Sequence, residues 1–253
     1  MLSASATHTG RVRKNNEDCV LADDTLGIYL LADGIGGLDA GEVASALAVE
    51  KVYEILRTNI DRTATDSLFE LMVHAIHSAH WEINTLEQGN AHLKRMGTTL
   101  VIAVIRDGQA HIVHAGDSRC YLFQRPTPAT SPESSSDGET SLTCLTHDHT
   151  LGNLQLTRGI EASSIPRKHF QTLTQSVGCG DPPLPDFTVV DLLANDLLLI
   201  CSDGLTDMLS DGEIEAYLGR GGTDLEQLAT QLIDAANQHG GRDNISVILV
   251  TTA

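Results

Sequence analysis

The sequence predicts an α+β fold in which antiparallel β-sheets pack against amphipathic helices. Three observations support this class. Apolar residues recur at helical spacing in three segments, and short apolar segments rich in β-branched residues lie between them. Tight-turn dipeptides join consecutive strands, which indicates hairpins rather than parallel crossovers. Sandwich and barrel folds often reach 253 residues as a single unit, and 41% hydrophobic residues are enough for a sizeable core, so we expect one domain spanning residues 1–253.

Three segments are expected to be helices because their apolar residues fall on one face. They are residues 42–58, 67–88 and 224–239. Ser67 and Glu70 form a capping-box pattern at the start of the second helix, and Thr223 and Glu226 form one at the start of the third. The Gly240–Gly241 pair marks the end of the third helix.

Six segments are expected to be strands because they are short, apolar and rich in β-branched residues. They are residues 28–32, 99–105, 109–115, 119–124, 196–201 and 245–251. The dipeptide Asp107-Gly108 is a strong hairpin signal, and Gly116-Asp117 marks a second tight turn. A further candidate strand follows Asp18.

Residues 125–141 differ in composition from the rest of the chain. They are rich in Ser, Thr and Pro and show no periodicity, which is typical of a mobile surface loop. Strands that are needed for one sheet lie on both sides of this segment. We therefore place the loop inside the domain rather than at a domain boundary.

Charge and cysteine content exclude several classes of protein. The chain has 34 acidic and 16 basic residues, a net charge of −18, and would repel nucleic acid and anionic membranes. Its five cysteines form no C-x-x-C motif, so neither a disulfide framework nor a zinc ribbon is expected. The sequence shows no apolar signal-peptide region and no stretch long enough to cross a bilayer. We expect a cytoplasmic protein that binds neither nucleic acid nor membrane.

Carboxylates recur at the ends of predicted strands, beside glycine or in turns. They are Glu17, Asp18, Asp33, Asp117, Asp203 and Asp243. Strand ends are rigid and can fix oxygen ligands, and a neighbouring glycine lets a backbone carbonyl approach an ion. An oxygen-rich set without thiolates suits hard cations such as Mg²⁺ or Mn²⁺. Ordinary turn chemistry is the alternative, because Asp-Gly is a common turn dipeptide and spacing alone does not show convergence.

Several short motifs, taken in order, resemble those of one enzyme family. They are TGRVRKNNED (9–18), LADGIGG (31–37), GEVAS (41–45), MGTT (96–99), HAGDSRCY (114–121), LTHDHT (145–150), CSDGLTD (201–207) and GGRDNISV (240–247). The chain resembles the metal-dependent protein phosphatases of the protein phosphatase 2C (PPM) type, particularly the bacterial members. The resemblance implies a four-layer α/β/β/α sandwich of two antiparallel sheets flanked by helices, with a metal centre at one end.

The resemblance also implies roles for individual residues. Asp33 would bridge two core cations, and the Gly34 carbonyl would bind one of them. Asp203 and Asp243 would bind the other. Asp117 resembles the residue that holds a weaker third cation together with the Asp203 position.

Three further residues match family positions near the metals. Glu17 and Asp18 would act mainly through metal-bound waters. Arg13 would bind the substrate phosphate, for which a guanidinium offers a planar fork of donors. Ile35 occupies the position where eukaryotic members often have a histidine proposed as general acid, and isoleucine cannot transfer a proton.

The implied reaction is hydrolysis of phosphoserine and phosphothreonine in proteins by a water that bridges two Mn²⁺ or Mg²⁺ ions. The implied partners are phosphorylated proteins and a cognate serine/threonine kinase, and we expect a monomer. One alternative is a binding module that recognises phosphorylated partners without turnover. Another is a metal phosphohydrolase that acts on small phosphate esters.

The resemblance places a flap that bears on substrate choice at about residues 149–187. The H-x-H pattern of His147 and His149 could bind a transition metal. In the family this segment leads into the flap and is not a core ligand set, so no metal role is assigned to it. Cys201, beside a candidate metal strand, is expected to be a buried apolar residue rather than a nucleophile.

Overall fold

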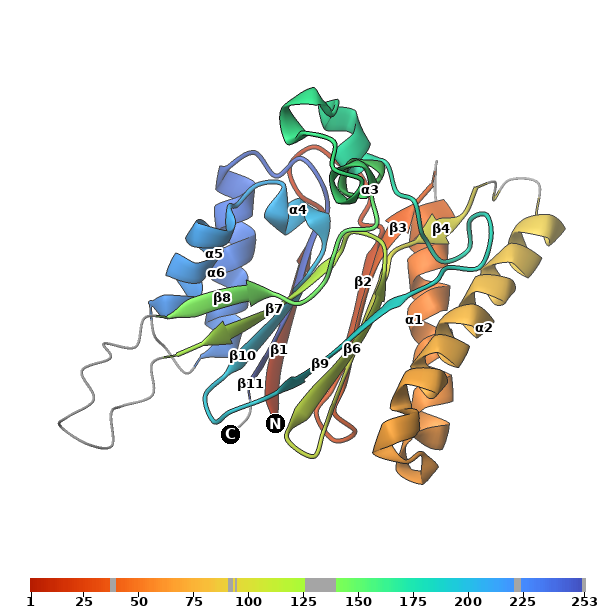
Figure 1. Ribbon diagram of the computed structural model, residues 1–253, viewed down its shortest axis with the longest axis horizontal. Helices are drawn as coiled ribbons and strands as arrows, with labels where there is room; N and C mark the ends of the chain where they lie inside the picture. The colour runs from red at the N-terminus through yellow and green to blue at the C-terminus, as the bar shows by residue number, and fades with distance from the viewer. Residues whose placement is uncertain (37–39, 91–92, 94, 126–139, 221–223, 252–253) are drawn as a thin grey trace.

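Two antiparallel sheets pack face to face in the computed structural model, and helices cover the outer face of each sheet (Figure 1). The structure describes residues 1–36, 40–90, 93, 95–125, 140–220 and 224–251. The predicted four-layer α+β sandwich is confirmed. The N-terminus lies at one end of the sandwich, opposite the end that carries α3 (Leu151–Thr157) (Figure 1).

Every pairing between neighbouring strands is antiparallel in the described part of the chain. The first sheet has the order β1 (Leu2–His8), β11 (Ile245–Thr251), β10 (Leu197–Cys201), β7 (Arg119–Gln124) and β8 (Ser141–Cys144). The second has the order β2 (Asp18–Asp23), β3 (Ile28–Ile35), β5 (Leu100–Arg106), β6 (Gln109–Ala115) and β9 (Asp186–Asp191), and β4 (Gly97–Thr98) pairs with the end of β3.

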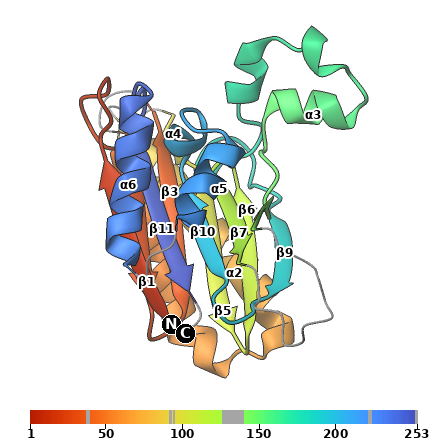
Figure 2. The same cartoon turned by 90° about the vertical axis from the view of Figure 1, so that its left-hand side faces the viewer.

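Helices form the two outer layers. On the second sheet they are α1 (Ala40–Asn59) and α2 (Leu68–Gly89); on the first they are α4 (Asp203–Thr206), α5 (Asp211–Gly219) and α6 (Leu225–Gln238). The segment between β8 and β9 contains α3 (Leu151–Thr157) and short 3₁₀ turns at Ala162–Ser164 and Arg167–Gln171. It projects from one end of the sandwich (Figure 2). Two further 3₁₀ turns, Ile60–Arg62 and Thr65–Ser67, join α1 to α2.

Side chains of the central strands are buried on both faces. In β3, Leu30 packs toward the helices, whereas Tyr29 and Leu31 pack between the sheets. In β10, Leu199 faces the helices and Ile200 faces the other sheet. Burial on both faces explains why these strands are continuous apolar runs rather than alternating ones.

Most local expectations agree with the structure. Asp107 and Gly108 have φ values of +53° and +77°, as a two-residue hairpin turn with both central residues left-handed requires. The third helix ends at Gln238, before the Gly240–Gly241 pair, whose φ values are +131° and +49°. No helix of the described chain has the length and apolar character needed to span a membrane.

The capping-box prediction at the second helix is wrong. Ser67 closes a 3₁₀ turn with φ −104° and ψ 7°, and its side chain makes no capping hydrogen bond. Thr223 of the other predicted box lies outside the described residues. At the start of α6, the Asp224 carboxylate caps the helix by accepting a hydrogen bond from the Gln227 amide at 2.9 Å. Residues 126–139 of the predicted loop also lie outside the described residues.

The missing capping box and the buried face of α2 together give a matched pair of stability predictions. Ile76 is fully buried against the sheet, so Ile76→Ala should lower the free energy of unfolding by about 2–5 kcal/mol. Glu70→Ala, at an exposed position without a capping role, should change it by less than about 0.5 kcal/mol. Urea unfolding followed by circular dichroism measures both. Equal losses in the two variants would contradict this description of α2.

Candidate functional site

A cleft of about 710 Å³ opens at the end of the sandwich from which the α3 segment projects. Its polar lining gathers the predicted residues Arg13, Glu17, Asp33, Gly34, Asp117, Asp203 and Asp243, together with Asp207. Asp18, which pairs with Asp33 across β2 and β3, lies beside them. Residues that the sequence separates by more than 200 positions therefore meet at one place.

Strand topology explains this convergence. Asp33 lies near the end of β3, and Asp18 begins β2 directly opposite it. Asp203 lies two residues after the end of β10, and Asp243 lies two residues before β11, which pairs with β10. Because neighbouring strands are antiparallel, the end of one and the start of the next meet at the same edge.

Two threonines fix the backbone of Asp33. The Thr99 hydroxyl accepts a hydrogen bond from the Asp33 amide at 3.0 Å, and the Asp33 carbonyl accepts bonds from the Thr99 amide and the Thr98 hydroxyl, each at 2.8 Å. The Thr99 hydroxyl also contacts the Ser118 hydroxyl at 2.7 Å. These contacts link the segment of Asp33 to the turn that carries Asp117.

Glycine is required next to two of the acids. A Cβ atom at Gly34 would collide with the carbonyl oxygens of Gly41 and Glu17, and one at Gly204 would collide with the carbonyl oxygen of Asn244. The close backbone approach allowed by glycine brings neighbouring segments together at the cleft.

The buried acids raise one another's pKa values. Burial is the largest cause of the raised pKa of Asp33, followed by the charges of Asp18, Asp203 and Asp117. Burial likewise raises the pKa of Asp203 most, with contributions from Asp117 and Asp243. Each side chain is thus close enough to several others to resist ionisation in the absence of a cation.

Asp18 shows this effect together with an unpartnered oxygen. The Ser202 hydroxyl donates to its Oδ2 at 2.8 Å, whereas its buried Oδ1 has no hydrogen-bond partner. Burial raises the pKa of Asp18 to about 6. Burial and then the charge of Asp148 raise the pKa of Asp117 to about 6 as well.

This donor set fits hard divalent cations. It consists of carboxylates and a backbone carbonyl, and one buried oxygen of Asp18 has no hydrogen-bond partner. Among the described residues that line the cleft, Arg13 is the one basic side chain. A cation would offset the repulsion between the acids and the loss of their hydration. Asp33, Asp203 and Asp243, with the Gly34 carbonyl, could hold such ions.

Arg13 reaches the acids from a loop held by Asn244. Its Nη2 lies 2.5 Å from Oδ2 of Asp243, and half of its side chain is exposed to solvent. The Asn244 amide group donates to the carbonyls of Thr9 and Asn15 at 3.0 and 2.8 Å, and its oxygen accepts from the Glu17 amide at 2.8 Å. Asn244 thereby fixes the loop that presents Arg13.

Sequence reasoning missed Asp207 and Asn244, although both lie inside motifs that it used. Asp207 lines the cleft, and the Gln171 side chain lies 3.4 Å from its Oδ2. Gln171 belongs to the predicted flap, whose returning residues form one wall of the cleft. Cys201 is fully buried and a free thiol with a raised pKa, caused mainly by burial, as expected for an inert residue.

Comparisons with known proteins place this geometry in a family. The family model described as protein phosphatase 2C matches residues 6–249. The serine/threonine phosphatase stp of Listeria monocytogenes is 34% identical over 251 residues, which cover 96% of this chain and 93% of that protein.

Solved structures agree with the sequence comparisons. The serine/threonine phosphatase PstP/Ppp of Mycobacterium tuberculosis superposes with a TM-score of 0.81 at 32% identity, covering 98% of this chain and 97% of that one. The catalytic domain of PstP in complex with 2 manganese ions gives 0.79 at 30% identity, covering 98% and 96%. The predicted family, fold class and enzyme class are confirmed, and the chain belongs to the protein phosphatase 2C family.

Proposed function

We propose that this protein is a metal-dependent phosphatase that removes phosphate from phosphoserine and phosphothreonine in other proteins. The observation that carries the proposal is the convergence of Asp33, Asp203 and Asp243 in a cleft that also contains Arg13. The names of its relatives, serine/threonine phosphatases, support the substrate class. A relative in complex with manganese supports the dependence on a divalent cation.

Two Mn²⁺ or Mg²⁺ ions are the proposed cofactors. When bound, such a pair supplies a bridging water of lowered pKa as the nucleophile for direct attack on phosphorus. Asp33 would contact both ions and the Gly34 carbonyl one of them, while Asp203 and Asp243 would bind the other. The antiparallel pairing of β2 with β3 and of β10 with β11 brings the backbone positions of these residues to one edge of the sandwich.

Three further acids are proposed to act around this pair. Asp117, with Asp203, would hold a weaker third cation; both line the same cleft. Glu17 and Asp18 would act through water molecules. The Ser202 hydroxyl orients one oxygen of Asp18 and leaves the other free for such a contact.

Arg13 is proposed to bind the phosphate of the substrate. A guanidinium matches a phosphate dianion with paired donors, and Arg13 is half exposed at the mouth of the cleft. Its Asp243 contact holds it over the acids. Ile35 also lines the cleft and carries no transferable proton, so the leaving serine oxygen takes its proton from another group.

The biological setting is proposed on the same basis. The partners would be phosphorylated proteins and a serine/threonine kinase whose products this enzyme reverses. We propose that residues 1–253 act as one phosphatase domain, as a monomer in the cytoplasm. The flap wall of the cleft would contact the protein around the phosphorylated residue, which favours proteins over small phosphate esters.

The metal mechanism is tested with p-nitrophenyl phosphate and a phosphopeptide. We expect Mn²⁺-dependent turnover that EDTA abolishes. Asp203→Asn should reduce turnover by about 100-fold or more, the scale on which loss of a charge-stabilising group acts. Asp234→Asn, an exposed acid on α6, is the matched control and should keep full activity. Undiminished activity in EDTA would contradict the mechanism, and binding of phosphopeptide without turnover would favour the binding-module alternative.

The phosphate role of Arg13 predicts a change in KM. Arg13→Ala removes a charged hydrogen-bond donor from the phosphate, so KM for a phosphopeptide should rise about 10-fold or more. Lys14→Ala, an exposed neighbour in the same loop, serves as the control. Steady-state kinetics at saturating Mn²⁺ separates KM from kcat. An unchanged KM in Arg13→Ala would contradict the assignment of Arg13 to phosphate binding.

The raised pKa values predict how metal-induced stability depends on pH. Asp18 and Asp117 have pKa values of about 6 in the fold, compared with 3.8 ordinarily. Between these values the folded state binds more protons than the unfolded state, so these groups make the metal-free protein less stable as the pH rises. Cations bind the ionised acids and offset this loss. Mn²⁺ should therefore raise Tm more at about pH 7 than at about pH 5, relative to EDTA. Equal increments in thermal unfolding scans would contradict this.

A further inference from the structure

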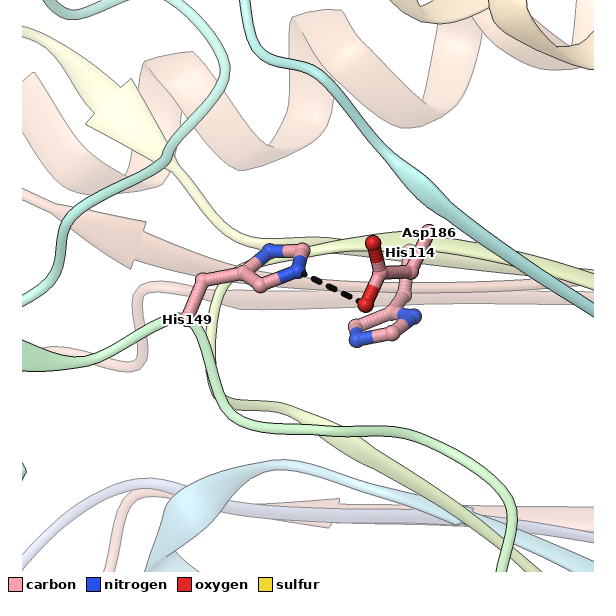
Figure 3. Close-up of side chains that lie close together, drawn as sticks. All are labelled: His114, His149 and Asp186. Atoms are coloured by element: carbon pink, nitrogen blue, oxygen red, sulfur yellow. Dashed lines mark ion pairs between the residues drawn. The ribbon is translucent and has the colours of Figure 1, made fainter. Parts of the chain in front are cut away.

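Three side chains that the proposed mechanism does not use meet beside the cleft (Figure 3). His114 lies near the end of β6, His149 lies at the start of the predicted flap, and Asp186 begins β9, where the flap ends. His114 and Asp186 are paired across β6 and β9. The cluster thus joins both ends of the flap to the strand that leads into the Gly116–Asp117 turn.

His149 is bound to that turn by two hydrogen bonds. Its backbone amide donates to the Gly116 carbonyl at 2.9 Å, and the Gly116 amide donates to its Nδ1 at 3.2 Å. Its backbone carbonyl accepts from the Thr174 amide, on the returning leg of the flap, at 2.8 Å. One residue therefore contacts both the flap and the residue that precedes Asp117.

The bond from Gly116 selects one tautomer of the neutral imidazole. Because Nδ1 accepts a hydrogen bond, the proton of the neutral ring lies on Nε2. Nε2 is buried, has no hydrogen-bond partner, and lies 3.4 Å from Oδ2 of Asp186, the contact that the dashed line in Figure 3 marks. Asp186 thus favours the tautomer that leaves Nδ1 free to receive the Gly116 amide.

Packing holds the imidazole in this orientation. The His149 side chain is only 9% exposed, and its ring stacks on that of His114 with centroids 4.7 Å apart and planes 10° apart. His114 is itself buried and bonded through Nε2 to the His147 carbonyl at 2.9 Å. Burial lowers the pKa of His114, which disfavours a positive charge on the stacked ring.

The cluster fits a hydrogen-bonded support better than a metal site. Its donor atoms lie within 4.8 Å of one another, a spacing that an ion could bridge. However, a cation on Nε2 of His149 would move the ring proton to Nδ1 and break the bond from Gly116. Two nearly parallel rings also cannot both direct a lone pair at one ion without rotating.

The neighbouring residue adds a second connection between the same two segments. Asp148 receives two bonds from the Arg119 guanidinium, at 2.8 and 2.7 Å. Residues 148–149 therefore hold the turn on both sides of Asp117, at Gly116 and at Arg119. The Asp117 side chain itself faces the cleft between these fixed points.

We propose that His149 is a positioning residue that sets the place of Asp117 through the Gly116 amide, with Asp186 orienting its imidazole. The consequence is that the two ends of the flap determine how firmly Asp117 is presented to a cation. This inference rests on the proposed role of Asp117 in cation binding. It adds a supporting role for His149 and Asp186, which the proposed mechanism itself does not use.

The test compares two substitutions of similar size. His149→Asn keeps an acceptor near the position of Nδ1, whereas His149→Leu keeps bulk without an acceptor. We expect His149→Leu to weaken the weakest Mn²⁺ site about 10-fold or more in calorimetric titrations, as loss of a supporting contact does, and His149→Asn to restore most of the affinity. Asp186→Ala, at an exposed position, should have an intermediate effect. His147→Ala is the control, because its side chain is exposed and only its backbone contacts His114.

Hydrogen exchange at the Gly116 amide gives a readout that does not depend on activity or on metal. Exchange should accelerate in His149→Leu and stay slow in His149→Asn. Wild-type rates in His149→Leu, equal impairment of the Leu and Asn variants, or Zn²⁺ binding that requires His149 and Asp186 would each overturn the inference. If the proposed function fails instead, the wild-type protein itself shows no Mn²⁺ binding, which distinguishes the two failures.

Discussion

The structure depends on one electrostatic constraint: several carboxylates are buried together at one end of a sandwich. Asp33, Asp203 and Asp18 each lose hydration and repel the others, and their pKa values rise accordingly. Such a set is unfavourable unless protons or cations neutralise it. The fold nevertheless holds these carboxylates together, as the proposed binding of cations at this end of the sandwich requires.

Hydrogen bonds from neighbouring residues hold the acids in this unfavourable arrangement. The Thr98–Thr99 pair fixes Asp33, the Ser202 hydroxyl orients Asp18, and Asn244 ties the Arg13 loop to the start of β11. Each contact joins segments that are far apart in the chain. The aliphatic layers between and outside the sheets provide the rigid frame on which these polar contacts rely.

The flap also makes contacts between distant segments, on the side of the cleft where we propose that the substrate binds. Its returning residues form a wall of the cleft. Near its two ends, the side chains of His149 and Asp186 contact each other. The segment that we propose to contact a substrate protein is thereby connected to the turn carrying Asp117. Substrate recognition and presentation of a metal ligand would then share one structural support.

Sequence alone predicted the elements whose burial leaves a strong pattern. Central strands such as β5 and β10 are continuous apolar runs because both faces are covered. It missed β1, β8 and β9, edge strands with largely exposed side chains and weak patterns. The capping box at Ser67 failed because the preceding chain forms a 3₁₀ turn, a choice that local sequence does not reveal.

For the site, the position of acids at strand ends selected residues that the structure brings together at one cleft, and the family resemblance supplied the roles expected of them. The pattern could not show convergence, since Arg13 and Asp243 are 230 positions apart and meet only through the sheet topology. Asn244 was missed for the same reason, and His149 was noted only as part of an H-x-H pattern. Their contributions are hydrogen bonds to distant backbone groups, which no local motif displays.

The most direct measurement is anomalous diffraction at the manganese absorption edge from crystals grown with Mn²⁺. We predict two strong peaks among the side chains of Asp33, Asp203 and Asp243, with oxygen atoms as ligands. Crystals in which these three carboxylates enclose no anomalous peak, while Mn²⁺ supports turnover in solution, would contradict it.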